Sequence, residues 1–283
     1  MEQIKEKKEK NKVKRPYEKI LNKKIEEGLA ELCRPAKGLF FSALSAGLDV
    51  GFSLLIMGVV VSLTQGIFPE NIVKLLYSLA YPVGFIFVIL GRSELFTEHT
   101  TLAVVPVLKG KASFKLLARL WGIVFSANII GAGIFALILS VIGPQMDIIS
   151  ADILVHFAKE MTADNWWTIL ASATMAGWMM GLLAWLVTGA DDTLSKIVIV
   201  ALITFGIGIA GFHHSIVGSV EVLSGLFVST EITIFDYLKF ILWSTLGNAI
   251  GGAFFVAILK YSHAIRPGML PEGVNLEFDE EDN

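Results

Sequence analysis

Residues 91–100 read GRSELFTEHT and carry an arginine, two glutamates and a histidine. This stretch lies inside an apolar segment that runs from about residue 75 to residue 108. Ionisable groups at membrane depth are costly and usually mark a functional site. The interruption therefore raises the question of which fold places such groups inside a membrane-like segment.

The composition indicates an integral membrane protein. Of the 283 residues, 54% are hydrophobic and only 17% are charged, against about 25% charged residues in soluble domains. The first 37 residues hold twelve Lys and Arg, so we expect no apolar signal-peptide core there. Cys33 is the single cysteine, which excludes an intrachain disulfide and a dithiol redox motif.

Six segments have the roughly 20 apolar residues that a membrane-spanning helix needs. They are residues 38–64, 75–108, 117–143, 166–188, 194–228 and 237–262. With the N-terminus inside, 19 of the 23 Lys and Arg fall on the cytoplasmic side, as the positive-inside rule requires. We therefore predict a protein of the plasma membrane, most simply a bacterial inner membrane, with both termini cytoplasmic.

Three parts follow from this organisation. Residues 1–37 form a basic cytoplasmic arm, in which the spacing of apolar residues over 16–34 predicts an amphipathic helix. Residues 38–262 form the transmembrane domain. Residues 263–283 form an acidic cytoplasmic tail, ending in EFDEEDN.

An internal repeat relates the two halves of the transmembrane domain. Asn128 in SANIIGAGIF and Asn248 in TLGNAIGGAFF lie 120 residues apart, each followed by Ile and Gly at the same spacing. Two further matches have the same order: Gly47-x-x-x-Gly51 with Gly177-x-x-x-Gly181, 130 apart, and Glu94 with His214, 120 apart. Because each half has three spans, the halves enter the membrane from opposite sides, which is the inverted repeat of many transport proteins.

The second and fifth segments each contain a polar interruption, GRSELFTEHT and GFHHSIVG (residues 211–218). In one interpretation each helix ends at its glycine and the polar cluster lies in an aqueous loop. In the other, the helix breaks inside the membrane and its loose backbone lines a cavity. The apolar tails LAVVPVL and VEVLSGLF that follow favour the second interpretation.

SELFTEHT, GFHHSIVG and GNAIGG (residues 247–252) together resemble the motifs of the formate/nitrite transporter (FNT) family. The resemblance covers about residues 35–262. It implies an all-α membrane protein with six transmembrane helices in two inverted three-helix repeats, an aquaporin-like arrangement whose second and fifth helices are broken. It also implies a homopentamer with a separate pore in each protomer.

The same resemblance assigns the pore residues. Glu94, Leu95, Phe96 and Thr97 would form a loop at the first break. Phe96 and Ile207 would lie near constrictions, and His214 would be the central pore histidine. Independently of the resemblance, we expect His213 to point away from the pore and to orient His214 through a hydrogen bond. We expect Asn128 and Asn248 to bind broken backbone groups, whereas the resemblance implies that one of them helps to hold the histidine.

Four positions depart from the family pattern, which indicates a divergent branch. They are Arg92, Gly177, His213 and Gly218. Arg92 and Glu94 lie two residues apart, which allows no facing contact on a regular helix. A loop would let them neutralise each other.

The predicted function is a channel or transporter in the bilayer for small monovalent anions of the formate and nitrite type, or their conjugate acids. An imidazole in an apolar pore is expected to be neutral, and to donate a hydrogen bond or a proton when an anion enters. This would link His214 to proton transfer or pH gating. We expect no enzyme activity, no cofactor and no nucleic-acid partner.

Two alternatives remain. A metal site or membrane enzyme would use His99, His213, His214, Glu94 and Glu98, although no H-E-x-x-H motif or cysteine cluster supports it. A scaffold or sensor descended from a channel would keep the fold without transport. Metal analysis and flux measurements in liposomes separate these from the channel.

Overall fold

The computed structural model describes residues 16–258, and every regular element in that range is a helix. The start of the basic arm, residues 1–15, and the acidic tail, residues 263–283, lie outside the described residues. The helices in chain order are α2 (Pro16–Cys33), α3 (Ala36–Asp49), α4 (Gly51–Thr64), α5 (Glu70–Ala80), α6 (Pro82–Gly91), α7 (Phe96–Leu102), α8 (Val104–Leu108), α9 (Phe114–Gln145), α10 (Ala151–Thr162), α11 (Trp166–Gly189), α12 (Thr193–Ala210), α13 (Ser215–Val228), α14 (Ile234–Ile250) and the π-helix η1 (Gly251–Ile258).

Within residues 16–258, five helical segments are long and apolar enough to cross a membrane. They are Ala36–Thr64, Glu70–Gly91, Phe114–Gln145, Trp166–Gly189 and Thr193–Ala210. The predicted spans 38–64, 117–143 and 166–188 each match one of these segments within a few residues. The predicted spans 75–108 and 194–228 each contain a helix break, and the sixth, 237–262, corresponds to α14 with η1 as far as the described residues extend.

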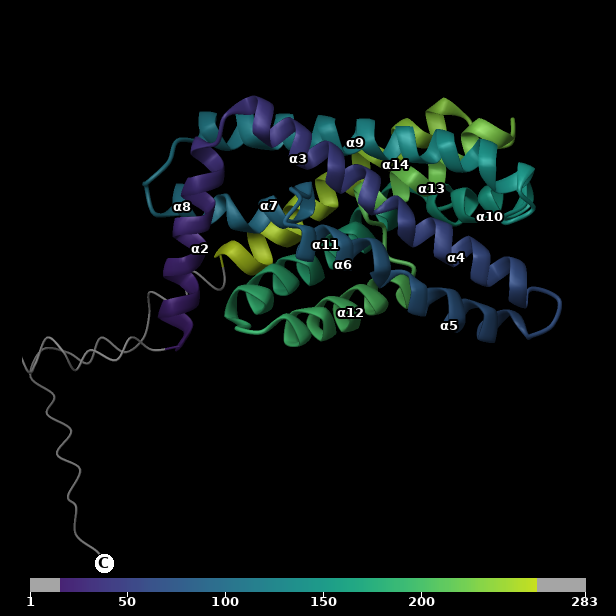
Figure 1. Cartoon of the computed structure of the whole chain (residues 1–283). Helices are drawn as coiled ribbons and strands as arrows, with labels where there is room; N and C mark the ends of the chain where they lie inside the picture. Colours follow the sequence, from purple (N-terminus) through teal and green to yellow (C-terminus); the bar gives the residue numbers. More distant parts are fainter. Residues whose placement is uncertain (1–15, 259–283) are drawn as a thin grey trace, which may run out of the picture.

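The long helices run side by side in one bundle (Figure 1). Helix α3 packs along α9, and α11 packs in the same way along α14 and η1. Helix α2 lies across one end of this bundle, whereas the turn between α4 and α5 lies with α10 at the opposite end (Figure 1). The molecule therefore has an α2 end and an α10 end, which are the two directions from which its centre can be approached.

The amphipathic helix predicted over residues 16–34 is present as α2. Its apolar side chains Leu21, Ile25 and Leu32 are buried, and Lys24 is buried with them at 1% exposure. This helix contacts α7, α8, α9 and α11. It therefore covers the α2 end of the bundle as part of the folded domain.

The loop between the third and fourth predicted spans contains a helix that the sequence analysis did not include. Helix α10 turns Ile153, Leu154 and Phe157 inward and packs against α13. Several of its polar residues, among them His156 and Lys159, are exposed. This packing sets one wall of the site described below.

Most of the later helices begin at a side-chain N-cap, which satisfies one of the free backbone N–H groups of the first turn. The capping residues are Ser113, Ser150, Asn165, Asp192, His214 and Thr233. At the start of α12, the Ser195 hydroxyl and backbone N–H both donate to Asp192. These two hydrogen bonds hold the pKa of the Asp192 carboxyl below its ordinary value. The cap fixes where α12 enters the bundle.

The surface of the bundle is strongly apolar. Large hydrophobic side chains are exposed along the outer faces of α9, α12 and α14, including Ile130, Leu137, Leu202, Leu238 and Leu242. Burying each such side chain is worth about 1.5–3 kcal/mol, so water is a poor solvent for this surface. The exposed faces are those of a protein surrounded by lipid.

Candidate functional site

Two helix breaks lie at the centre of the bundle and are held in the same way. Helix α6 ends at Gly91 and α7 begins at Phe96, whereas α12 ends at Ala210 and α13 begins at Ser215. The Phe96 backbone N–H donates to Asn128 Oδ1 at 2.8 Å, and the Ser215 backbone N–H donates to Asn248 Oδ1, also at 2.8 Å. The first backbone N–H of α7 and of α13 is therefore bonded by an asparagine side chain that belongs to a helix distant in the sequence.

The two asparagine amides also donate to matching carbonyls. Asn128 Nδ2 donates to the carbonyls of Ala43 and Glu94, at 2.7 and 2.9 Å. Asn248 Nδ2 donates to the carbonyls of Ala173 and His213, at 2.8 and 3.0 Å. These bonds satisfy backbone groups that the breaks leave without helical partners, which would otherwise be costly in a buried site. The prediction that Asn128 and Asn248 bind broken backbone is confirmed by these contacts.

These contacts shift the predicted match between the two halves by one residue. Phe96 and Ser215 make equivalent bonds and are 119 residues apart, so Leu95 corresponds to His214 and Glu94 corresponds to His213. The sequence analysis paired Glu94 with His214. It also placed the first loop at Glu94–Thr97, whereas the structure places it at residues 92–95, with Phe96 and Thr97 in the first turn of α7. The reason is the Asn128 cap, which starts the helix at Phe96.

Close helix contacts at both breaks require glycine. A Cβ atom on Gly47 would lie 2.2 Å from the Asn128 carbonyl oxygen, and a Cβ atom on Gly177 would lie 2.2 Å from that of Asn248. A Cβ atom on Gly218 would lie 2.4 Å from Phe240 Cζ. Gly177 and Gly218, two of the four departures from the family pattern, therefore have a steric reason in this chain.

His214 lies at the second break and is fully buried. Its Nδ1 accepts a hydrogen bond from the Val217 backbone N–H at 3.3 Å, and its Nε2 is 2.9 Å from Thr97 Oγ1. Because Nδ1 is an acceptor, these bonds assign the ring its neutral tautomer, with the proton on Nε2 and donated to Thr97. The histidine of one break and the threonine of the other therefore meet at the centre of the molecule.

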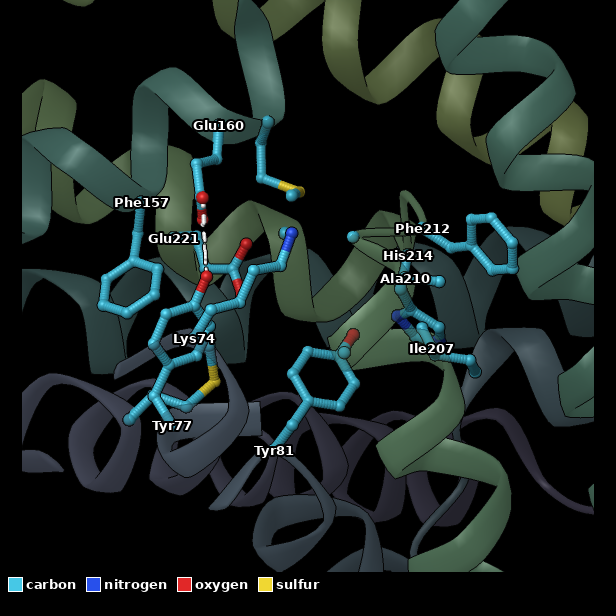
Figure 2. Close-up of a pocket in the computed structure, with 15 residues that line it drawn as sticks. Lys74, Tyr77, Tyr81, Phe157, Glu160, Ile207, Ala210, Phe212, His214 and Glu221 are labelled. Atoms are coloured by element: carbon cyan, nitrogen blue, oxygen red, sulfur yellow. Dashed lines mark hydrogen bonds between the residues drawn. The ribbon is translucent and has the colours of Figure 1, made fainter. Parts of the chain in front are cut away.

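A cavity of about 220 Å³ reaches His214 from the α10 end. We call it the inner cavity. Figure 2 shows His214 and Ile207 on one side of it and Glu221 with Lys74 on the other, with the Tyr81 ring between the two sides. The remaining lining residues are Met57, Tyr77, Phe157, Glu160, Met161, Gly208, Ala210, Gly211, Phe212 and Gly218.

A wider cavity of about 860 Å³ adjoins the inner cavity and shares Lys74, Tyr77 and Glu160 with it. We call it the outer cavity. It is bordered by the turn between α4 and α5 and by α10. The two cavities together form a route from the α10 end of the bundle to His214.

The other residues of the predicted site lie away from both cavities. Leu95 and Phe96 are buried, and the Phe96 ring packs edge-on against Trp121 and Phe125. His213 is also buried and does not bond His214; its Nδ1 is 2.8 Å from Ser172 Oγ. The prediction that His213 orients His214 through a hydrogen bond is therefore wrong, because His213 Nδ1 is paired with the hydroxyl group of Ser172.

Glu94 has a structural role that the sequence analysis did not foresee. Its carboxylate accepts a hydrogen bond from Arg34 Nη1 at 2.7 Å and lies 2.5 Å from His99 Nε2. Arg92, by contrast, is exposed and has a left-handed backbone conformation with φ of 55°. Glu94 therefore joins the end of α2 to α7 and is not neutralised by Arg92.

Replacing Glu94 with glutamine is expected to lower the stability of the protein by about 2 kcal/mol, because charge-assisted hydrogen bonds to Arg34 and His99 are lost. The measurement is the midpoint of thermal unfolding of the detergent-purified protein. Glu26, an exposed residue of α2, provides the matched control as Glu26→Gln. Equal unfolding midpoints for the two variants would contradict this role of Glu94.

Sequence reasoning missed several residues of the cavities, above all Glu221, Tyr77, Tyr81 and Lys74. Glu221 stands inside the apolar tail VEVLSGLF, and a carboxyl group in such a segment was itself a signal. Within the part of the chain that the structure describes, no group of three or more His, Cys, Asp and Glu is arranged to hold a metal ion.

Comparison with known proteins gives consistent matches over most of the chain. A family profile described as "Formate/nitrite transporter" matches residues 18–262. "Inner membrane protein YfdC" of Escherichia coli (strain K12) is 35% identical over 240 residues, which cover 84% of this chain and 75% of that protein.

Two solved structures are also similar. One, named "FNT family ion channel", matches with a TM-score of 0.78 at 20% identity, covering 86% of this chain and 98% of that chain. Another, named "Pentameric formate channel with formate bound", matches with a TM-score of 0.68 at 22% identity, covering 82% and 98%. At these identities the two likenesses show a shared fold.

Proposed function

Since this chain belongs to the formate/nitrite transporter family, we propose that it forms a transmembrane channel for small monovalent anions or their conjugate acids. The protein is an integral membrane protein. The observation that carries the proposal is the placement of His214. Its ring lines the inner cavity and, through Thr97, contacts the other half of the bundle.

The proposed architecture has six spans in two inverted three-helix repeats. The doubled contacts support it: Gly47, Asn128 and Phe96 make the same contacts as Gly177, Asn248 and Ser215. In this arrangement α12 and α13 form the broken fifth span, and α14 with η1 forms the sixth. The breaks then lie at matching depths, which is the usual place of a transport site.

The proposed sidedness puts the α2 end in the cytoplasm of a bacterial cell and the α10 end outside. The excess of Lys and Arg in the N-terminal arm and in the loop before α9 supports this orientation. The assembly we propose is a homopentamer with one pore in each protomer. The fold shared with a "Pentameric formate channel" and the exposed apolar faces of the bundle support this assembly.

The proposed mechanism starts from the cost of dehydrating an anion. Moving a small ion from water into an apolar medium costs of order 20 kcal/mol in the idealised case. His214 Nε2–H is a fixed donor that bonds Thr97, and the ring that carries it lines the inner cavity. An arriving anion accepts this hydrogen bond in place of the threonine hydroxyl. It then crosses as the anion or, when a proton from water in the route has first converted the ring to imidazolium and Nε2 then gives up its proton, as the neutral acid, which leaves the imidazole neutral again.

Ile207 and Phe96 restrict water on the two sides of His214 in this proposal. Ile207 lines the inner cavity beside the histidine, and Phe96 starts the helix that carries Thr97. Leu95, Asn128 and Asn248 hold the two breaks in position. His213 and Glu94 support the same region from outside the route.

A flux panel tests the function. Purified protein in liposomes is expected to carry formate, nitrite, acetate and hydrosulfide faster than sulfate, and faster at about pH 5 than at about pH 8, the range in which histidine changes charge. Protein-free liposomes give the background. If every anion remained at background at both pH values, the scaffold or sensor alternative would replace the channel.

A further inference from the structure

Glu221 is a buried carboxyl group that the mechanism above does not use. It lies on α13, two turns after His214, and is only 3% exposed. Figure 2 shows it on the side of the inner cavity opposite His214, near Tyr77 and Glu160. Any solute that travels from the outer cavity to His214 passes it.

The ionisable groups around Glu221 come from several elements. Helix α10 contributes Glu160, and helix α5 contributes Lys74 and Tyr77. Tyr81 follows α5 and faces the same cavity, as does the His214 ring. The Tyr77 hydroxyl donates to the two carboxylate oxygens of Glu160 at 3.4 Å. This hydroxyl is therefore already hydrogen-bonded to Glu160.

The other helices packed against α13 add little charge near Glu221. Helix α4 has no charged residue, and α9 carries only Lys115 and Arg119, both in its first two turns at the α2 end. From α14, the Tyr237 hydroxyl donates to Ser219 Oγ at 3.4 Å. The two charged residues of α14 are paired elsewhere, Asp236 with Thr233 and Lys239 with the carbonyls of Thr162 and Asp164. Lys74 is thus the one cation among the residues that line the inner cavity.

Glu221 has no close polar partner within residues 16–258. The structure shows neither a hydrogen bond to its carboxyl group nor a salt bridge within 4.0 Å in that range, and Lys74 itself is partly exposed to the route. A lone carboxylate in such surroundings is costly. The protonated form of Glu221 is therefore favoured in these surroundings, whereas the carboxylate would need a hydrogen-bond donor or a cation as a partner.

We propose that Glu221 is a proton-binding residue of the conduit and that a small anion enters the inner cavity from the α10 end only when this carboxyl group carries its proton. The proposal rests on the proposed function, because it concerns an anion on its way to His214. A protonated Glu221 donates a hydrogen bond to the anion. An ionised Glu221 in the same cavity would repel it and reduce its occupancy roughly tenfold.

The proton balance is simple. The carboxyl O–H is either kept, so that the anion moves on alone, or transferred to the anion, so that formate leaves as formic acid and Glu221 remains as a carboxylate. In the second case the carboxylate takes its next proton from water in the outer cavity. Neither case needs a further reactant.

Glu221→Gln tests the proposal, because glutamine has the shape of the protonated acid but does not titrate. Labelled formate influx is measured in liposomes at external pH values from about 5 to about 8. At the acid end the variant should match the wild type. At the alkaline end it should be roughly tenfold faster, whereas Glu221→Asp should keep the pH dependence of the wild type.

Two controls make the comparison strict. Glu231→Gln removes an exposed carboxyl group at the same end of the bundle, outside both cavities, and should leave the pH profile unchanged. Cys33, the single cysteine, is exposed at the α2 end. A membrane-impermeant maleimide therefore counts the molecules whose α2 end faces outward, which gives the orientation in each preparation.

The possible results distinguish a failure of the Glu221 proposal from a failure of the proposed channel function. A Glu221→Gln profile that follows the wild type within twofold at every pH would overturn the proposal while leaving the channel function intact. Absence of formate influx in the wild type would instead overturn the function. Dicyclohexylcarbodiimide, which modifies protonated carboxyl groups in apolar surroundings, gives a readout without flux or mutation. It should label Glu221 at acid pH, and no labelling at any pH would also overturn the proposal.

Discussion

Replacing His214 with phenylalanine is expected to lower formate flux by roughly a hundredfold, the scale of a lost proton donor, and to remove the part of the pH dependence that His214 contributes, while the part assigned to Glu221 remains. The variant loses the Nε2–H that bonds Thr97 and the imidazole ring that lines the inner cavity. It should still fold, because an aromatic ring at this position keeps its edge-on contact with Phe85. Loss of the cap on Val217 costs only about 1 kcal/mol.

Influx of labelled formate into liposomes at about pH 5 and about pH 8 is the measurement. Thr97→Val is the matched control, since it removes the hydroxyl partner and leaves the histidine donor in place. Its flux should stay within a few-fold of the wild type. Unchanged flux and pH response in His214→Phe, with intact assembly by size-exclusion chromatography, would refute the role of His214.

Replacing Gly177 with alanine is expected to destabilise the protein by about 3 kcal/mol or more, at the upper end of overpacking effects. The added methyl carbon would lie 2.2 Å from the Asn248 carbonyl oxygen, which is backbone and cannot turn aside as a flexible side chain would. Helices α11 and α14 must then separate. The Asn248 amide would move away from Ser215 and release the start of α13.

Gly122 is the matched control for this prediction. It is an exposed residue of α9, and a Cβ atom added to it would have no neighbouring atom within 4 Å. Gly122→Ala should therefore be neutral or stabilising by up to about 1 kcal/mol, the helix propensity difference between the two residues. The midpoint of thermal unfolding and the yield of folded protein are compared. Equal behaviour of the two alanine variants would show that the α11–α14 contact is not as tight as described.

The sequence predicted the two helix breaks because each combines a glycine with a polar cluster inside an apolar segment. Gly211 does end α12 with a left-handed φ of 66°, but the equivalent residue at the first break is Arg92, with φ of 55°. Spacing alone paired Glu94 with His214. Only the hydrogen bonds of Asn128 and Asn248 show which backbone N–H begins each helix, and they move the match to Glu94 and His213.

The sequence was less informative about the walls of the route. Helix α10 is short and amphipathic, so a search for long apolar segments passes over it. Glu221 was counted within an apolar tail, and Lys74 was counted as a flanking residue. Glu221 and Lys74 line the same cavity only because of the way α5, α10 and α13 pack together. Local sequence patterns do not reveal such packing between distant helices.

The asparagine caps have a mechanical consequence. Each interrupted backbone segment is bonded to a helix whose outer face is exposed and apolar, α9 for Phe96 and α14 for Ser215. A change in bilayer thickness tilts such helices at modest cost. Tilting α9 or α14 would pull on the amide that fixes the first turn of α7 or α13. Under the proposed function, we therefore expect thinner bilayers to change the rate of anion flux without any change at the residues that line the two cavities.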